Sequence, residues 1–138
     1  MRKIKNFLEY LYYKYYKFQI YVGNSDVAPL FAMLIIIFAV LIYIPSILLI
    51  IIFFFPHMAA LYWLAKHVNK TDYMLFVILL FICSYFLFLH KKKYKKIMKR
   101  EELNEKSNLT AILFSLMSFI LYVIGCVLAI MGDISKLR

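Results

Sequence analysis

Three long stretches of the chain contain no Asp, Glu, Lys, Arg or His, and they constrain the fold more than any other feature. They run over 28–55, 73–89 and 109–131. A helix needs roughly 17–25 mainly apolar residues to cross the hydrocarbon of a bilayer. Each backbone polar group in that layer must be satisfied by the chain itself, which favours helices. The stretches therefore predict an all-α membrane protein with three transmembrane helices in a single membrane domain over 1–138.

The first stretch leaves a fourth crossing open. A helix over 28–55 would be about 42 Å long at 1.5 Å per residue. That length exceeds a hydrocarbon thickness of about 30 Å unless the helix tilts or bends. If the chain turned at Pro45–Ser46, the apolar residues of 57–65 would complete a second, shorter helix. The chain would then have four spans instead of three.

The distribution of basic residues favours three spans. Five Lys and Arg precede residue 28, eight lie in 90–108, two lie in 56–72 and two lie in the C-terminal tail. Cytoplasmic loops carry an excess of basic residues. Three spans with a cytoplasmic N-terminus place thirteen basic residues inside and four outside, whereas four spans place nine inside and eight outside. We therefore expect three spans, with the N-terminus in the cytoplasm and the C-terminus outside.

Composition indicates what surrounds these helices. Hydrophobic residues make up 65% of the chain, against about 45–50% in soluble domains, so lipid must cover much of the surface. The net charge of +10 would suggest nucleic acid in a soluble domain. In so apolar a chain it indicates a bilayer with anionic headgroups. We expect that lipid, and no nucleic acid, as a partner.

Three further segments flank the spans. Apolar residues recur every three or four positions over 3–22, which predicts an amphipathic interfacial helix. The pair Gly23–Asn24 is typical of a helix stop. Residues 57–68 carry Tyr and the single Trp, which predicts an outer interfacial segment. Residues 90–106 predict a basic cytoplasmic helix that extends the second span.

The basic segment allows two interpretations. It can be a solvated extension that only fixes the orientation of the second span, or it can contact anionic lipid. The side chains that would make the lipid contact are Lys91, Lys92, Lys93, Lys95, Lys96, Lys99 and Arg100.

Small residues recur at heptad spacing along the third span. Small side chains let transmembrane backbones approach closely, and Gly125 with Ala129 forms a Gly-x-x-x-Ala pair. Contact with another span of the same chain remains possible, as does contact with a second copy or a membrane partner. The predicted packing seam consists of Ala111, Ser115, Ser118, Tyr122, Gly125, Ala129 and Gly132.

The sequence carries no motif for catalysis. It has no Gly-rich phosphate loop, no His-Glu metalloprotease motif and no serine nucleophile with a visible base. His57 and His67 are ten residues apart and, with Asp72, form only a weak metal candidate. We expect no catalytic residue, no metal and no cofactor. Because the spans lack ionisable residues, a coupled transporter is also disfavoured.

Residues 12–34, YYKYYKFQIYVGNSDVAPLFAML, precede the basic run KKKYKKIMKR and a final apolar helix. This pattern resembles a loose group of small uncharacterised multi-span bacterial inner-membrane proteins. The resemblance implies an inner-membrane location. It also implies one of two roles that have been suspected for such proteins, as immunity partners of secreted toxins or as membrane effectors of defence systems.

Two functions follow from these patterns. The first is a non-enzymatic membrane protein that acts through helix–helix interaction in the bilayer, with an immunity or accessory role as its most concrete form. The alternative is a homo-oligomeric pore-forming protein, or a lysis or defence effector. A pore former should depolarise the membrane when it is expressed, and an interaction protein should not.

Overall fold

The structure, a computed structural model, describes residues 2–54, 67 and 69–136. These residues form helices and no strand. The elements in chain order are α1 (Arg2–Tyr21), α2 (Ala28–Phe54), α4 (Lys70–Ser84), a π-helical turn (Tyr85–Leu89), a 3-10 turn (His90–Lys92), α5 (Lys93–Met98), α6 (Glu102–Glu105) and α7 (Leu109–Lys136).

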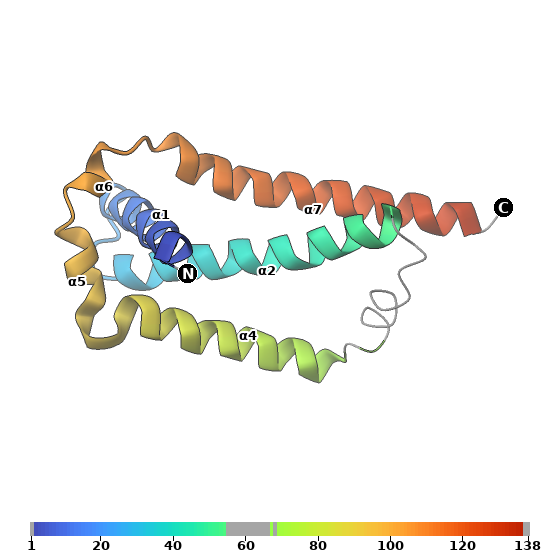
Figure 1. The fold of residues 1–138 in the computed structure, drawn as a ribbon, viewed down its shortest axis with the longest axis horizontal. Coiled ribbons are helices and arrows are strands. Elements are labelled where there is room, and N and C mark those ends of the chain that lie inside the picture. Colours follow the sequence, from blue (N-terminus) through green and yellow to red (C-terminus); the bar gives the residue numbers. More distant parts are fainter. Residues whose placement is uncertain (1, 55–66, 68, 137–138) are drawn as a thin grey trace.

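Three of these helical stretches are long and apolar enough to cross a membrane, which confirms the predicted all-α class and its three candidate spans within the described residues. They are Ala28–Phe54, Lys70–Met98 and Leu109–Leu128. Figure 1 shows α2 in the middle, with α7 on one side and α4 on the other. The chain runs in the same direction along α2 and α7 and in the opposite direction along α4.

The first span is one helix, because α2 continues through Pro45 without the turn that four spans would need. Pro45 cannot donate a hydrogen bond to the carbonyl one turn earlier. The neighbouring Ser46 is buried and donates from Oγ to the backbone oxygen of Ile42 at 2.7 Å. The helix therefore continues through Pro45, and the Ser46 hydroxyl is bonded within α2.

Gly125 lies where α7 contacts α2. A Cβ atom on Gly125 would lie 3.5 Å from Leu49 Cδ1 and 3.6 Å from Ser46 Cα. Nearer the other end, Tyr43 donates from its hydroxyl to the backbone oxygen of Phe114 at 2.8 Å. The two helices therefore pack along a shared face, with little space between their backbones at Gly125.

The end of α1 agrees with the predicted helix stop. Gly23 has a φ of +91°, and its N–H donates to the oxygen of Ile20 at 3.0 Å. The N–H of Asn24 donates to the oxygen of Gln19 at 2.9 Å. This pair of bonds is the Schellman arrangement, which glycine favours because it has no Cβ.

The prediction of one continuous basic helix over 90–106 is wrong. Lys91 and Lys92 both adopt left-handed backbone conformations, with φ of 53° and 54°. Two successive left-handed residues end a helix, so α5 and α6 are separate short helices that turn back towards α1 (Figure 1). Lys93 Nζ donates to the oxygen of Phe86 at 2.8 Å and closes this turn.

The predicted outer interfacial segment over 57–68 lies outside the described residues, apart from His67. The elements α1, α5 and α6 gather at one end of the long helices (Figure 1). The last described turn of α7 lies at the opposite end from α1.

Candidate functional site

The middle of α1 is enclosed by the rest of the chain. The six consecutive residues from Tyr10 to Tyr15 are all buried, and six residues cover every side of a helix with 3.6 residues per turn. Apolar side chains near its ends, such as Ile4 and Phe18, are exposed. The expected amphipathic pattern, with one buried and one exposed face, is therefore not seen from Tyr10 to Tyr15, where residues of both faces are buried.

Tyr12 is the centre of this packing. Its side chain is fully buried, and its ring stacks on Phe88 of the π-helical turn, with centroids 4.5 Å apart and planes 7° from parallel. Its hydroxyl donates to the backbone oxygen of Pro29 at 3.0 Å. Burial raises the pKa of Tyr12. One side chain thus joins α1 to α2 and to the end of α4.

A series of polar contacts joins the other side of α1 to the chain around α6 and the start of α7. Each contact pairs a polar side chain of α1 with a group of the 100–115 segment. They are Glu9 Oε2 with Arg100 Nη1 at 2.7 Å, Tyr10 Oη with the oxygen of Ser107 at 2.7 Å, Lys14 Nζ with the oxygen of Asn104 at 3.1 Å, and Tyr15 Oη with the oxygen of Ala111 at 2.9 Å. Tyr15 also shares a hydrogen bond of 2.6 Å with Ser115 Oγ.

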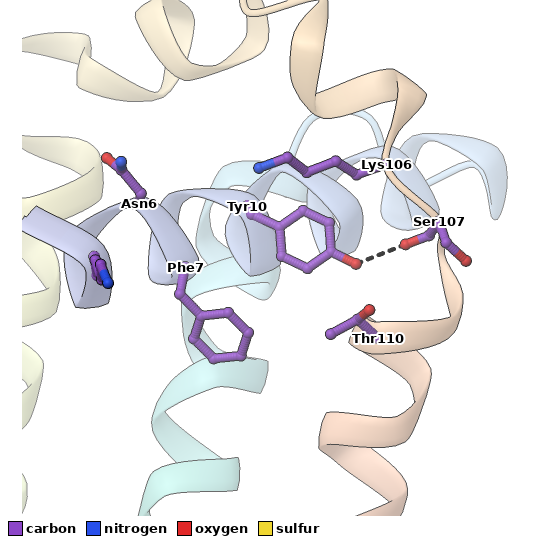
Figure 2. A pocket seen from close by; sticks show the side chains of 7 residues that line it. Asn6, Phe7, Tyr10, Lys106, Ser107 and Thr110 are labelled. Carbon is purple, nitrogen blue, oxygen red and sulfur yellow. Dashed lines mark hydrogen bonds between the residues drawn. The ribbon is translucent and has the colours of Figure 1, made fainter.

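A groove of about 520 Å³ opens on one side of this crossing. Figure 2 shows Phe7 and Tyr10 of α1 facing Thr110 across it, with the Tyr10 hydroxyl bonded to the Ser107 oxygen. The Lys106 ammonium lies 5.8 Å from the centroid of the Tyr10 ring. The groove is therefore lined by two lysines, Lys3 and Lys106, together with aromatic rings and polar side chains.

A larger groove of about 1050 Å³ lies on the other side of α1. Lys14 and Lys17 line it together with Asn104 and Asn108. Its remaining lining is mainly apolar and comes from the end of α1, from α2 and from one face of α7: Tyr13, Tyr15, Phe18, Ile20, Tyr21, Ile35, Ala111, Ile112, Ser115, Leu116 and Phe119. Cationic and apolar surfaces thus share one groove.

The structure distributes the predicted packing seam over several environments. Ala111 and Ser118 are buried, and Gly125 lies against α2. Ser115 is bonded to Tyr15 of α1. Tyr122 is 48% exposed. The side chains of Ala129 and Gly132 lie outside the described part of the structure.

The basic residues predicted to contact lipid lie at the end of the molecule where α1 crosses the bundle (Figure 1). Arg100 differs from the others, because its guanidinium pairs with Glu9. Lys93 bonds a backbone oxygen within its own turn. All seven residues of the set are exposed: Lys91, Lys92, Lys93, Lys95, Lys96, Lys99 and Arg100. Their contact with anionic lipid stays a prediction.

Sequence reasoning did not find the contacts made by Tyr10, Tyr12 and Tyr15. Their signal was present in YLYYKYYK, residues 10–17, where tyrosines occur on every side of the expected helix. A tyrosine can be buried when its hydroxyl has a partner. Aromatic residues on all faces therefore indicate an enclosed helix better than an amphipathic one.

Within the described residues, no group of three or more His, Cys, Asp and Glu side chains could hold a metal ion. Comparison with known proteins adds no family to this description. No family model, no curated protein and no solved structure matches the chain.

Proposed function

We propose that the chain is a multi-pass protein of a bacterial inner membrane that has no enzymatic activity and acts through helix–helix interaction with a partner in the bilayer. An immunity or accessory role is the concrete form of this proposal. The three apolar helices support the membrane location. Within the described residues, α2 packs along α7, and α1 is bonded both to α2 and to the start of α7.

The orientation that we propose places the end with α1, α5 and α6 in the cytoplasm. Exposed lysines gather there, on α1 and in the segment that follows α4 (Figure 1). Basic segments next to spans are retained on the cytoplasmic side. The C-terminal end of α7 would then lie outside.

The exposure of α4 is the observation that carries the interaction proposal. Among the fifteen residues of this helix only Ser84 is buried. Leu75, Ile78 and Leu79 are each more than half exposed, and Figure 1 shows α2 on one side of α4 only. Van der Waals packing drives helix association in lipid. The exposed apolar side chains of α4 are therefore a surface against which a partner helix can pack.

The alternative, a homo-oligomeric pore or a lysis or defence effector, needs polar side chains that face a shared channel. Ser46 is buried and bonded to Ile42. Ser118 is buried and donates to the backbone oxygen of Ser115 at 2.7 Å, and the Ser115 hydroxyl is shared with Tyr15. Engagement of these hydroxyls inside the chain favours the interaction proposal over the pore.

Crosslinking through α4 tests the interaction. Cys83 is exposed on this helix, whereas Cys126 on α7 is partly buried. In native membranes, a membrane-permeant reagent that carries one maleimide and one diazirine should attach to the thiol and, on irradiation, produce a crosslinked species larger than the monomer. The Cys126→Ser variant should retain that species, and the matched Cys83→Ser variant should lose it.

Mass spectrometry of the crosslinked species identifies the partner. A different membrane protein, with an unchanged membrane potential on expression, supports the proposal. A second copy of this chain together with a collapsed potential supports the pore instead. If the Cys126→Ser variant is expressed normally and gives no crosslink, the interaction proposal is contradicted at α4.

A further inference from the structure

The larger groove beside α1 has a cationic end and an apolar end. At the cationic end, the Lys14 and Lys17 ammonium groups lie 5.9 Å and 5.8 Å from the centroid of the same Tyr13 ring. Asn104 and Asn108 belong to the same lining. Two cations and two amides thus surround one part of the groove.

These cations have no acidic partner in the groove, because none of the described residues that line it is acidic. Lys14 is 8% exposed and donates one hydrogen bond, to the Asn104 oxygen, which leaves two of its three N–H donors. Burial lowers the pKa of Lys14, and the charge of Lys17 lowers it further. An anion bound between the two lysines would offset both effects.

The apolar end continues along α7. Ile112, Leu116 and Phe119 are spaced by four and three residues, so they share one face of the helix. All three are at least half exposed, and together they extend about 10 Å along the helix axis at 1.5 Å per residue. This face leads from the cationic end towards the middle of the apolar span.

We propose that this groove binds one anionic phospholipid, with its phosphate at Lys14 and Lys17 and its acyl chains along Ile112, Leu116 and Phe119. The order of charged and apolar surface in the groove matches the order of headgroup and tail in a lipid. The site is separate from the exposed lysines of 91–99. It depends on the proposed membrane location, and it does not depend on a helix partner at α4.

Native mass spectrometry of the detergent-solubilised protein tests the site. Phosphatidylglycerol and phosphatidylcholine with identical chains are titrated separately, and the dissociation constant of the first bound lipid is measured. The wild type should bind phosphatidylglycerol at least tenfold more tightly. Lys17→Gln should weaken that binding about fivefold, and Lys14→Gln with Lys17→Gln about 30-fold, since each lysine near an anionic lipid contributes a factor of about five.

The Lys5→Gln variant is the matched control, because Lys5 is exposed on the same helix, lies outside the groove and loses the same charge. It should bind like the wild type. Equal binding of the two lipids, or equal losses in Lys17→Gln and Lys5→Gln, overturns the proposal. Displacement of the lipid by millimolar glycerol phosphate or inorganic phosphate would indicate a site for free phosphate and also overturns it.

Circular dichroism of each variant tests whether the helical fold is kept when lipid binding is weakened. Lys17 is exposed and its ammonium only approaches a ring, so Lys17→Gln should fold normally. Crosslinking at Cys83 in the same variant separates the two proposals. An intact crosslink with weakened lipid binding supports the lipid site, and a lost crosslink with intact lipid binding concerns only the helix partner.

Discussion

Replacing Tyr12 by Ala should destabilise the protein more than any other single change in α1. The side chain is fully buried, stacks on Phe88 at 4.5 Å and donates to the Pro29 oxygen at 3.0 Å. Removal leaves a cavity where α1, α2 and the end of α4 meet. Because Phe88 is distant from Tyr12 in sequence, this contact cannot be restored by a local adjustment of α1.

The magnitude can be separated into parts. Truncation of a buried aromatic residue to Ala costs about 3–5 kcal/mol. Within that total, a stacked aromatic pair contributes about 0.5–1.5 kcal/mol beyond burial. The hydroxyl bond contributes about 0.5–1.5 kcal/mol, and Tyr12→Phe should cost that amount, because the Pro29 oxygen lies in the first turn of α2 and keeps its helical donor.

Reversible unfolding in mixed detergent micelles, followed by circular dichroism, measures these costs. A double-mutant cycle with Tyr12→Ala and Phe88→Ala should give a coupling free energy of about 0.5–1.5 kcal/mol. Tyr21 is 90% exposed on the same helix, so Tyr21→Ala is the control and should cost less than about 0.5 kcal/mol. Equal costs for Tyr12→Ala and Tyr21→Ala, or no coupling to Phe88, would refute the placement of α1 at the centre of the packing.

Three other changes test separate contacts. Gly125→Ala should leave the stability nearly unchanged, since the added Cβ meets α2 at ordinary contact distance. Gly125→Leu should cost about 1–3 kcal/mol by overpacking. The free energies of unfolding in detergent distinguish the two variants. Burial raises the pKa of Tyr12 and Tyr15. These tyrosines therefore ionise at a lower pH in the unfolded chain than in the folded chain. The folded state should lose stability as the pH rises above about 10. Ultraviolet titration of tyrosinate should show late-ionising groups, one fewer in Tyr12→Phe, and ordinary titration of every tyrosine would contradict this. Arg100→Gln removes a partly exposed ion pair with Glu9 and should cost about 0.2–1 kcal/mol, with a smaller effect in high salt.

The long helices were predictable because they depend on local composition. The first span was expected over 28–55, and α2 covers Ala28–Phe54. The third was expected over 109–131, and α7 begins at Leu109 and continues to Lys136. A run of apolar residues without charge is sufficient to form a helix in hydrocarbon, whatever packs against it.

The break after the second span was not predictable from residue type. Lys91 and Lys92 adopt left-handed conformations that are usually found at Gly or Asn. Nothing in a run of lysines signals such a turn. The closing bond from Lys93 to Phe86 and the pairing of Arg100 with Glu9 are visible only once the chain has folded back on α1.

The amino-acid sequence by itself determined the class of the protein, the extent of its apolar helices and the uneven distribution of basic charge. These properties depend on the composition of neighbouring residues, and the length and orientation of a helix in a bilayer depend on that composition directly. Only the tertiary structure decided that α1 is enclosed and that its tyrosines hold α7. Tyr10 meets Ser107 and Tyr15 meets Ala111 across 97 and 96 residues, and such distant pairs are chosen by the packing of the whole chain and not by any local pattern.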